Sequence, residues 1–256
     1  MTLDRREFLQ LSAAGLLASR ALPRSGALLA ERGKYRAVAF DAFPILDPRP
    51  VFALAEGLFP GRGAELSSAW RSRQFEYQWL RALGHQYADF LLTTEDALVF
   101  AAKQLQLELS PDVRSQLVQA YMKLEAWPDV RPTLSALKAA GLRLAFLSNM
   151  TAAMLNAGIE NAELDGFFEH VLSTDARRTY KPDPLAYEMG VDAFKLKREE
   201  IVFVSFAGWD ASGAKWFGYP TVWVNRLDAP AEDLGVVPDA VGRDLSVLTK
   251  FVGLPG

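Results

Sequence analysis

The sequence predicts an α/β protein built on a doubly wound, parallel β-sheet with an inserted helical segment. Two observations predict the sheet: short, continuous apolar segments recur along the chain, and segments with helical patterns separate them. Strands of a parallel sheet are covered by helices on both faces, so they are apolar throughout instead of alternating with polar residues. A third observation predicts the insertion, because one connection between strands is far longer than a crossover helix requires.

Five segments are expected to form the strands of the sheet. Each is short and rich in β-branched or aromatic residues. They are residues 35–41, 142–149, 170–174, 201–206 and 221–225. A helix is expected before the second strand, at 131–141, where Leu134 and Leu137 have near-helical spacing and Gly141 is a stop signal. This alternation indicates a Rossmann-like topology.

The long connection lies between the first and second predicted strands. Helical patterns fill much of it, at 65–83 and at 93–107, and we expect a threonine N-cap to open the second of these helices. We interpret residues 52–128 as a helical cap that closes a cleft at the carboxyl ends of the strands. Residues 35–51 and 129–256 then form the core domain.

Composition excludes several classes of function. The chain has 256 residues, half of them hydrophobic, and a net charge of -3, which gives no indication of nucleic-acid binding. The absence of cysteine excludes disulfides and thiolate chemistry. The two histidines, His85 and His170, lack metal-ligand spacing and are expected to have packing roles.

Residues 1–30 resemble a twin-arginine export signal. Arg5 and Arg6 precede Phe8 and Leu9, and a run rich in alanine and leucine follows. Two later arginines interrupt that run, so an amphipathic helix is the alternative. We therefore expect a periplasmic protein, with a cytoplasmic one as the alternative. No later segment has the roughly 20 uncharged apolar residues of a membrane span, so no stable membrane association is expected after export.

Polar residues follow four of the predicted strands. The carboxyl ends of parallel strands meet at one edge of a sheet, where ligands of open α/β sheets bind. Each residue alone is unremarkable, since Ser-Asn after a strand is usually a turn. Together they place two acids, hydroxyls and an amine at one edge. The residues are Asp41, Ser148, Asn149, Lys181, Ser205 and Asp210.

Longer motifs around these residues resemble the haloacid dehalogenase superfamily and, within it, the L-2-haloacid dehalogenases. The resemblance covers nearly everything after residue 35. It rests on FDAFPILD at 40–47, AWRSRQFEYQWLR at 69–81, LSNM at 147–150, YKPDPLAY at 180–187 and the segment 205–226. It implies hydrolysis of short L-2-haloalkanoic acids to D-2-hydroxy acids through an aspartyl ester, with substrate and water as partners and with no metal or cofactor. Such proteins commonly form homodimers, and the cap segment around Trp70 and Trp79 is a candidate surface.

The resemblance assigns catalytic roles to five residues. Asp41 is the nucleophile, and Lys181 keeps it ionised, since a nearby opposite charge favours a carboxylate. Arg71 receives the halide, and Asp210 activates water against the ester. The resemblance also places Ser205, at the end of the fourth predicted strand, among the catalytic residues.

A second group is expected to bind substrate. Ser148 and Asn149 match residues that bind the substrate carboxylate, and Tyr187 matches a tyrosine that supports Lys181 and the anion site. Apolar contacts around the halogen and the alkyl group are expected from Phe43, Ile45, Phe90 and Trp209.

Departures from the family pattern leave alternatives open. A phosphatase of this superfamily has acids at the positions of Phe43 and Ser205, so that reading is disfavoured. The family's Gly-Thr after the nucleophile is Pro44-Ile45 here, and an asparagine is replaced by Ala207. These losses are compatible with a slower enzyme of altered specificity or with a non-catalytic carboxylate binder. The sequence does not fix the preferred halogen or chain length.

Overall fold

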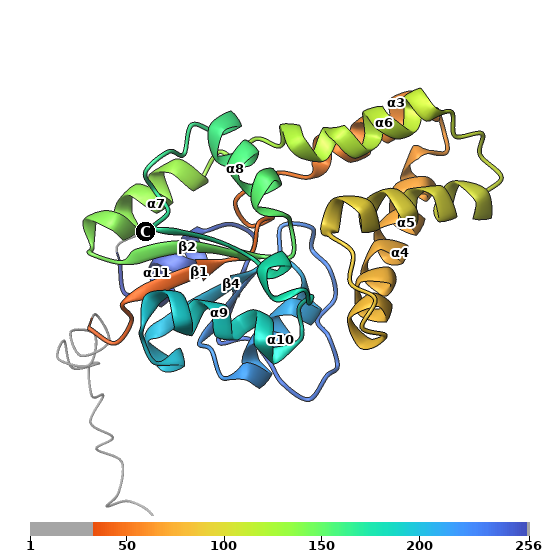
Figure 1. Ribbon diagram of the computed structural model, residues 1–256. Coiled ribbons are helices and arrows are strands. Elements are labelled where there is room, and N and C mark those ends of the chain that lie inside the picture. The colour runs from red at the N-terminus through yellow and green to blue at the C-terminus, as the bar shows by residue number, and fades with distance from the viewer. Residues whose placement is uncertain (1–32, 255–256) are drawn as a thin grey trace, which may run out of the picture.

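A computed structural model describes residues 33–254 of the chain, and the predicted export segment, 1–30, lies outside them. A central sheet carries helices on both faces, and a group of helices projects from one end of this core (Figure 1). Within the described residues, no helix has the length and apolar character of a membrane span.

The sheet has six strands, all parallel, in the order β3-β2-β1-β4-β5-β6. The predicted fold class is therefore confirmed. The sequence did not predict β6, which has only three residues, none of them buried, and so lacks a continuous apolar run. The strands are β1 (Ala37–Phe40), β2 (Arg143–Ser148), β3 (His170–Ser173), β4 (Ile201–Ser205), β5 (Thr221–Val224) and β6 (Ala240–Gly242).

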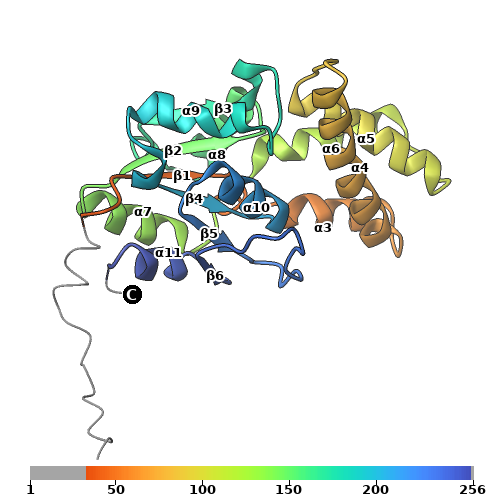
Figure 2. The same ribbon diagram turned by 90° about the horizontal axis from the view of Figure 1, so that it is seen from below.

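Alternate residues of β1 enter two separate cores, as expected for a strand buried on both faces. Val38 and Phe40 pack in the core under helices α7 (Val130–Ala139), α8 (Ala152–Asn161) and α11 (Ser246–Phe251). Ala37 and Ala39 belong to the opposite core, under α9 (Pro184–Phe194) and α10 (Gly208–Phe217). Figure 1 shows α7 and α8 above the sheet and α9 and α10 below it, and Figure 2 views the spread strands from below.

The register of the central strands brings their carboxyl ends together. Phe40 lies opposite Phe146 of β2 on one side and Val204 of β4 on the other. The backbone N–H of Asp41 still bonds to the Val204 carbonyl at 2.9 Å, so this residue is held at the end of the sheet. The strand order also reverses between β1 and β4, and ligands of open α/β sheets bind at such a point.

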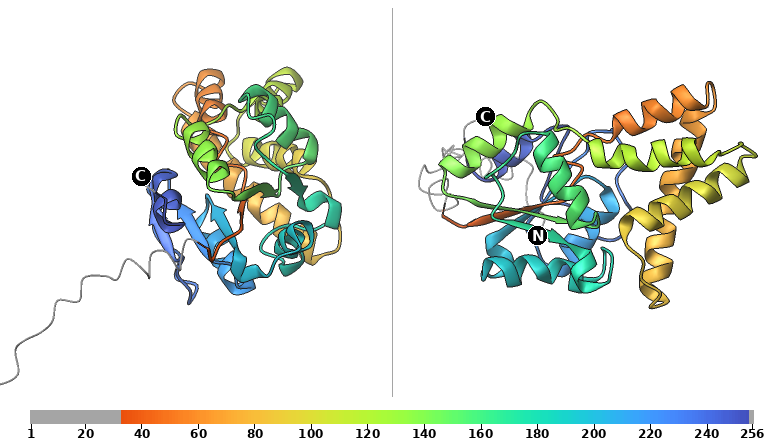
Figure 3. Two further views of the ribbon diagram at one scale, coloured as in Figure 1. Left: turned by 90° about the vertical axis from the view of Figure 1, so that its left-hand side faces the viewer. Right: turned by 45° about the horizontal axis from the view of Figure 1, so that its top comes forward.

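The cap is formed by helices between β1 and β2. Helices α4 and α5 pack against each other and stand away from the sheet, whereas α3 runs beside α6 (Figure 3). The first helix of the cap, α3, begins three residues before residue 52, the predicted start of the insertion. They are α3 (Arg49–Leu58), α4 (Gly63–Leu83), α5 (Phe90–Gln104), α6 (Pro111–Ala120) and the short η1 (Tyr121–Lys123).

The prediction of a threonine N-cap for α5 is wrong. The helix begins at Phe90, and the Asp89 side chain caps it by accepting from the Leu92 N–H at 2.8 Å. Thr93 and Thr94 are inside the helix and buried, and the Thr94 hydroxyl donates to the Phe90 carbonyl at 2.6 Å. Aspartate is an equally good N-cap, and burial of the threonines against other elements decided the boundary.

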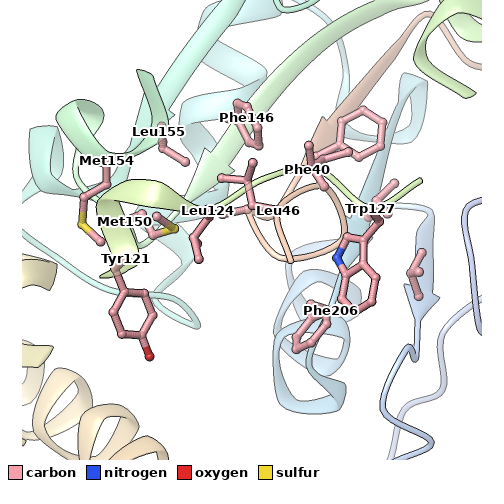
Figure 4. Close-up of a cluster of buried hydrophobic side chains, with 14 of the residues drawn as sticks. Phe40, Leu46, Tyr121, Leu124, Trp127, Phe146, Met150, Met154, Leu155 and Phe206 are labelled. Atoms are coloured by element: carbon pink, nitrogen blue, oxygen red, sulfur yellow. The ribbon is translucent and has the colours of Figure 1, made fainter. Parts of the chain in front are cut away.

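The two segments that join the cap to the core run side by side. Leu46 and Ala126 form an antiparallel bridge, and the Trp127 N–H donates to the Ile45 carbonyl at 3.1 Å. Leu46, Leu124 and Trp127 belong to the same buried apolar cluster as Phe40 of the sheet (Figure 4). This shared core holds the base of the cap against the carboxyl end of β1.

Candidate active site

A cavity lies at the carboxyl ends of β1, β2 and β4, with α4 contributing part of its lining. Its volume is about 40 Å³. Eight of the residues predicted for the site line it. They are Asp41, Phe43, Arg71, Phe90, Ser148, Asn149, Trp209 and Asp210.

Lys181 holds the two acids of the site together. Its Nζ donates to Oδ1 of Asp41 at 2.9 Å and to Oδ2 of Asp210 at 2.7 Å, and the residue is almost fully buried. Burial lowers the pKa of Lys181, but the attraction of the two carboxylates outweighs it, so the pKa lies above its usual value. The ammonium therefore stays charged, and it favours the ionised form of both acids.

The Asp41 carboxylate has one committed oxygen and one that is nearly free. Oδ1 accepts from Lys181 and from the Ser148 hydroxyl at 3.1 Å. Among the described residues, Oδ2 accepts only from the Phe43 N–H, at a long 3.4 Å. A carboxylate anchored through one oxygen keeps the lone pairs of the other for nucleophilic attack.

Asp210 lies in the first turn of α10 and is buried. Its Oδ1 accepts from the Tyr187 hydroxyl at 2.7 Å, and its Oδ2 accepts from Lys181. Burial and the nearby Asp41 charge raise the pKa of Asp210 to about 6, although Lys181 and Tyr187 act in the opposite direction. This carboxylate is ionised at neutral pH and is basic enough to take a proton from water.

Arg71 is the free cation of the cavity. Within residues 33–254, no acidic side chain lies within ion-pair distance of its guanidinium, which stands 5.9 Å from the centre of the Phe206 ring. Burial lowers the pKa of Arg71, yet an arginine remains protonated at neutral pH. An unpaired guanidinium in a largely apolar cavity favours an anionic ligand.

Aromatic side chains make the other walls of the site. The Trp209 ring packs edge-on against Phe75 and Trp79, with centroids 5.3 and 5.5 Å apart. Phe43 packs against Phe206 at 5.7 Å. These contacts exclude water from the space around the Asp41 carboxylate and so strengthen its electrostatic interactions.

Two of the residues predicted for the site, Ile45 and Ser205, do not line the cavity. Both are fully buried. Ile45 lies in a helical turn after β1, in which the Leu46 N–H bonds to the Ala42 carbonyl, and its side chain belongs to the core. Ser205 ends β4, and its hydroxyl is buried without a hydrogen-bond partner.

The substrate-binding roles expected for Ser148, Asn149 and Tyr187 stay predictions, and the structure shows what their side chains contact within the protein. The Ser148 hydroxyl donates to Oδ1 of Asp41 at 3.1 Å. The Asn149 carboxamide accepts from the Lys181 N–H at 2.9 Å and donates to Gln78 at 2.8 Å. Tyr187 does not line the cavity and orients Asp210, which it reaches from α9.

Two glutamines of the lining, Gln74 and Gln78, were not predicted from the sequence. Both are buried, and the Gln74 amide donates to the Thr94 hydroxyl at 2.5 Å. The signal was present, because residues spaced three or four apart share one face of a helix, and Arg71, Gln74 and Gln78 have that spacing. The other missed lining residues are Pro48, Phe52, Phe75, Tyr121, Phe206 and Ala207.

Within residues 33–254, no three or more His, Cys, Asp or Glu side chains gather in a group able to hold a metal ion. The expectation of metal-independent chemistry stays a prediction and is tested with a chelator below.

Comparison with known proteins agrees with this geometry. A family model described as haloacid dehalogenase-like hydrolase matches residues 20–218. Haloacetate dehalogenase H-2 of Moraxella sp. (strain B) is 42% identical over 207 residues, which are 80% of this chain and 92% of the relative. A crystal structure of an L-2-haloacid dehalogenase superposes with a TM-score of 0.83 at 43% identity, covering 86% of this chain and 99% of that one. The L-2-haloacid dehalogenase of Xanthobacter autotrophicus, solved with chloropropionic acid covalently bound, has a TM-score of 0.76 at 35% identity and covers 85% and 98%.

Proposed function

The chain belongs to the haloacid dehalogenase-like hydrolases, and we propose that it hydrolyses short L-2-haloalkanoic acids to D-2-hydroxy acids. One observation carries this proposal: the Lys181 ammonium binds both Asp41 and Asp210 beside a cavity in which the Arg71 guanidinium has no acidic partner among residues 33–254. A nucleophile, a base and an anion site are then present within one small, largely apolar space.

In the first step, a carboxylate oxygen of Asp41 attacks C2 of the substrate. The carbon–halogen bond breaks, and the halide leaves with the electron pair toward Arg71. Displacement of halide needs no proton on the leaving group, which fits the apolar Phe43 beside the nucleophile. Backside attack inverts C2, so an L substrate gives a D product.

In the second step, water hydrolyses the ester. Asp210 accepts a proton from this water, and the resulting hydroxide attacks the carboxyl carbon of Asp41. The bond between that carbon and the ester oxygen breaks, the departing alkoxide takes the remaining proton of the attacking hydroxyl, and Asp210 releases its own proton to solvent. Asp41 is regenerated with one oxygen from solvent, and the Lys181 ammonium stabilises its returning charge.

The departures from the family pattern have a structural context. Ile45 has no hydroxyl to offer the nucleophile, and the Asp41 carboxylate accepts a hydrogen bond from Ser148. A side chain from a distant part of the chain holds the turn at Pro44, because Arg226 donates to the Pro44 carbonyl at 2.7 Å. Ala207 lines the cavity without a polar group, so this side of the site is more apolar than the family pattern.

Both alternative functions are less well supported. A phosphatase needs an acid to protonate its leaving alcohol, and the corresponding side chain is that of Phe43, which lines the cavity. A carboxylate binder gains nothing from the buried carboxylates of Asp41 and Asp210 beside its anion site.

The proposal is tested by chloride release from L-2-chloropropionate in the presence of a chelator, with Asp41→Asn as the control. The expected result is release by the wild-type protein alone, unaffected by the chelator. In heavy-oxygen water, a single turnover is expected to label Asp41 before it labels the product. Absence of chloride above the control contradicts the proposal.

We also propose that residues 1–30 direct export through the twin-arginine pathway, which makes the protein periplasmic. The support is the Arg5-Arg6 pair before an alanine- and leucine-rich run. Cell fractionation of the wild type and of an Arg5→Lys, Arg6→Lys variant tests this proposal. Equal periplasmic amounts of the wild type and the variant contradict export through the arginine pair.

A homodimer is a further proposal, with the surface of α4 beside Trp79 as the contact. Trp70 is 1% exposed and donates to the Thr94 carbonyl, so it belongs to the interior of the cap. The exposed apolar side chains of α4 are Leu80 and Leu83, at 62% and 80%. Light scattering of the wild type and of Leu83→Glu measures whether these leucines form the contact, since a buried glutamate disfavours association.

A further inference from the structure

We propose that Gln78 binds the carboxylate of the substrate through its Nε2, as a specificity-determining residue of the site. This inference rests on the proposed function, because it assigns a new contact to the same substrate. It starts from a chain of hydrogen bonds that leaves one buried donor unused.

The orientation of the Gln78 amide is fixed by its neighbours. The Lys181 backbone N–H can only donate, and it donates to Oδ1 of Asn149 at 2.9 Å. The Nδ2 of Asn149 must therefore be the other end of that amide, and it donates to Oε1 of Gln78 at 2.8 Å. A flipped Gln78 would place two amide donors against each other, so Nε2 is the atom left over.

That leftover donor has no partner in the protein. Gln78 is 0% exposed and lines the cavity, yet its Nε2 makes no hydrogen bond within the described residues. A buried donor without an acceptor is unfavourable, and buried polar groups of this kind are rare in folded proteins. Gln74, one turn away, contrasts with it, because its Nε2 is already bonded to Thr94.

The substrate carboxylate is the acceptor that fits this position. Gln78 follows Arg71 by seven residues on α4, two helical turns or about 10 Å along the axis. A 2-haloacid with a contact at each end spans roughly 10 Å. Arg71 and Gln78 both line the cavity, so one such molecule can contact both side chains. With the halide at Arg71, the carboxylate lies near Gln78 and Asn149, at the end of β2.

The test compares binding of two anions, propionate and bromide, by quenching of tryptophan fluorescence, since Trp209 lines the cavity. Gln78→Met keeps the length of the side chain and removes the donor. Loss of a hydrogen bond to a charged group weakens propionate binding about 10- to 100-fold, whereas bromide binding at Arg71 changes little. Gln78→Glu retains the acceptor for Asn149, replaces the donor with a carboxylate and weakens propionate binding further.

Steady-state kinetics provide an independent measurement. The carboxylate keeps its charge throughout the reaction, so its contacts bind the substrate and the transition state equally. Gln78→Met is therefore expected to raise KM for L-2-chloropropionate about as much as the dissociation constant of propionate, with kcat changed less than about threefold.

Three results overturn the inference. The first is unchanged propionate affinity in a folded Gln78→Met variant. The second is an equal fall in the affinities for propionate and bromide. The third is an equal loss of propionate affinity in Gln74→Met, which removes an amide that is already hydrogen-bonded. Propionate binding requires no turnover, so these outcomes are distinct from failure of the proposed function, which is absence of chloride release by the wild-type protein.

Discussion

Replacement of Lys181 by methionine tests the arrangement on which the site depends. Methionine has a similar length and no charge, so the change removes the ammonium and leaves most of the packing. Asp41 and Asp210 would then face each other without the cation that bonds to them at 2.9 and 2.7 Å. Burial and the nearby Asp41 charge already raise the pKa of Asp210, and without Lys181 less opposes them, so Asp210 binds a proton more readily at neutral pH.

The size of the effect on the rate follows from the lost contacts. Two charge-assisted hydrogen bonds of about 1.5–3 kcal/mol each amount to roughly 3–6 kcal/mol, or a rate of chloride release lower by about 10²–10⁴-fold. Initial rates with L-2-chloropropionate measure this. A folded Lys181→Met protein that retains more than a tenth of the wild-type rate refutes the reasoning.

The same substitution has an expected effect on stability. Removing one partner of a buried ion pair costs about 3–5 kcal/mol in the free energy of unfolding near pH 7.5, measured with urea. The folded-state pKa of Asp210 lies above that of the unfolded chain, so its unfavourable ionisation is lost as pH falls through the folded pKa. The difference from the wild type is therefore expected to narrow at pH 5, and a constant difference contradicts this explanation.

Four further predictions concern the same site. Asp210→Asn is expected to accumulate an ester on Asp41, because attack on the substrate needs no base but hydrolysis of the ester does. Mass spectrometry would show the ester as an adduct of the substrate without its halide, and absence of the adduct counts against the role of Asp210. In the wild type, the rate of ester hydrolysis in a single turnover is expected to fall as pH decreases through about 6, since the pKa of Asp210 is raised to about 6 and only its ionised form accepts a proton; a flat profile excludes it as the base. Arg71→Met is expected to abolish bromide binding and to lower chloride release about 10²-fold, through loss of a contact worth roughly 1.5–3 kcal/mol, and unchanged bromide affinity would place the halide elsewhere. Ile45→Thr restores the residue typical of the family. It is expected to lower the free energy of unfolding, measured in urea, by about 1–3 kcal/mol without raising the rate of chloride release, because the threonine hydroxyl would be buried in the core. A faster rate of chloride release would show that this hydroxyl reaches Asp41.

The parts of the fold that followed from sequence are those with a local signal. Four of the six strands have continuous buried apolar runs, which identify them without reference to their neighbours. Strand β3 was also predicted, from the shorter apolar pair Val171-Leu172. Strand β6 is short and partly exposed, and it exists because it pairs with β5. The start of α5 was misplaced because two residue types with equal capping ability, Asp89 and Thr93, lie close together.

For the site, sequence by itself determined the chemistry available. Asp41, Lys181 and Asp210 follow strands whose carboxyl ends must meet at one edge of a parallel sheet, so their proximity was predictable from topology. Arg71 was identified by the motif around it and not by any physical rule.

Only the tertiary structure decided how each polar group is used. Side chains that line a site and side chains that support it look the same in sequence, because hydrogen-bond partners lie far apart along the chain. Ser148 serves Asp41, Tyr187 serves Asp210, and Ile45 is part of the core. The unpaired donor of Gln78 likewise appears only once the amide of Asn149 is oriented by the Lys181 backbone. The local pattern places residues at an edge, and long-range packing determines which of their atoms remain free for a substrate.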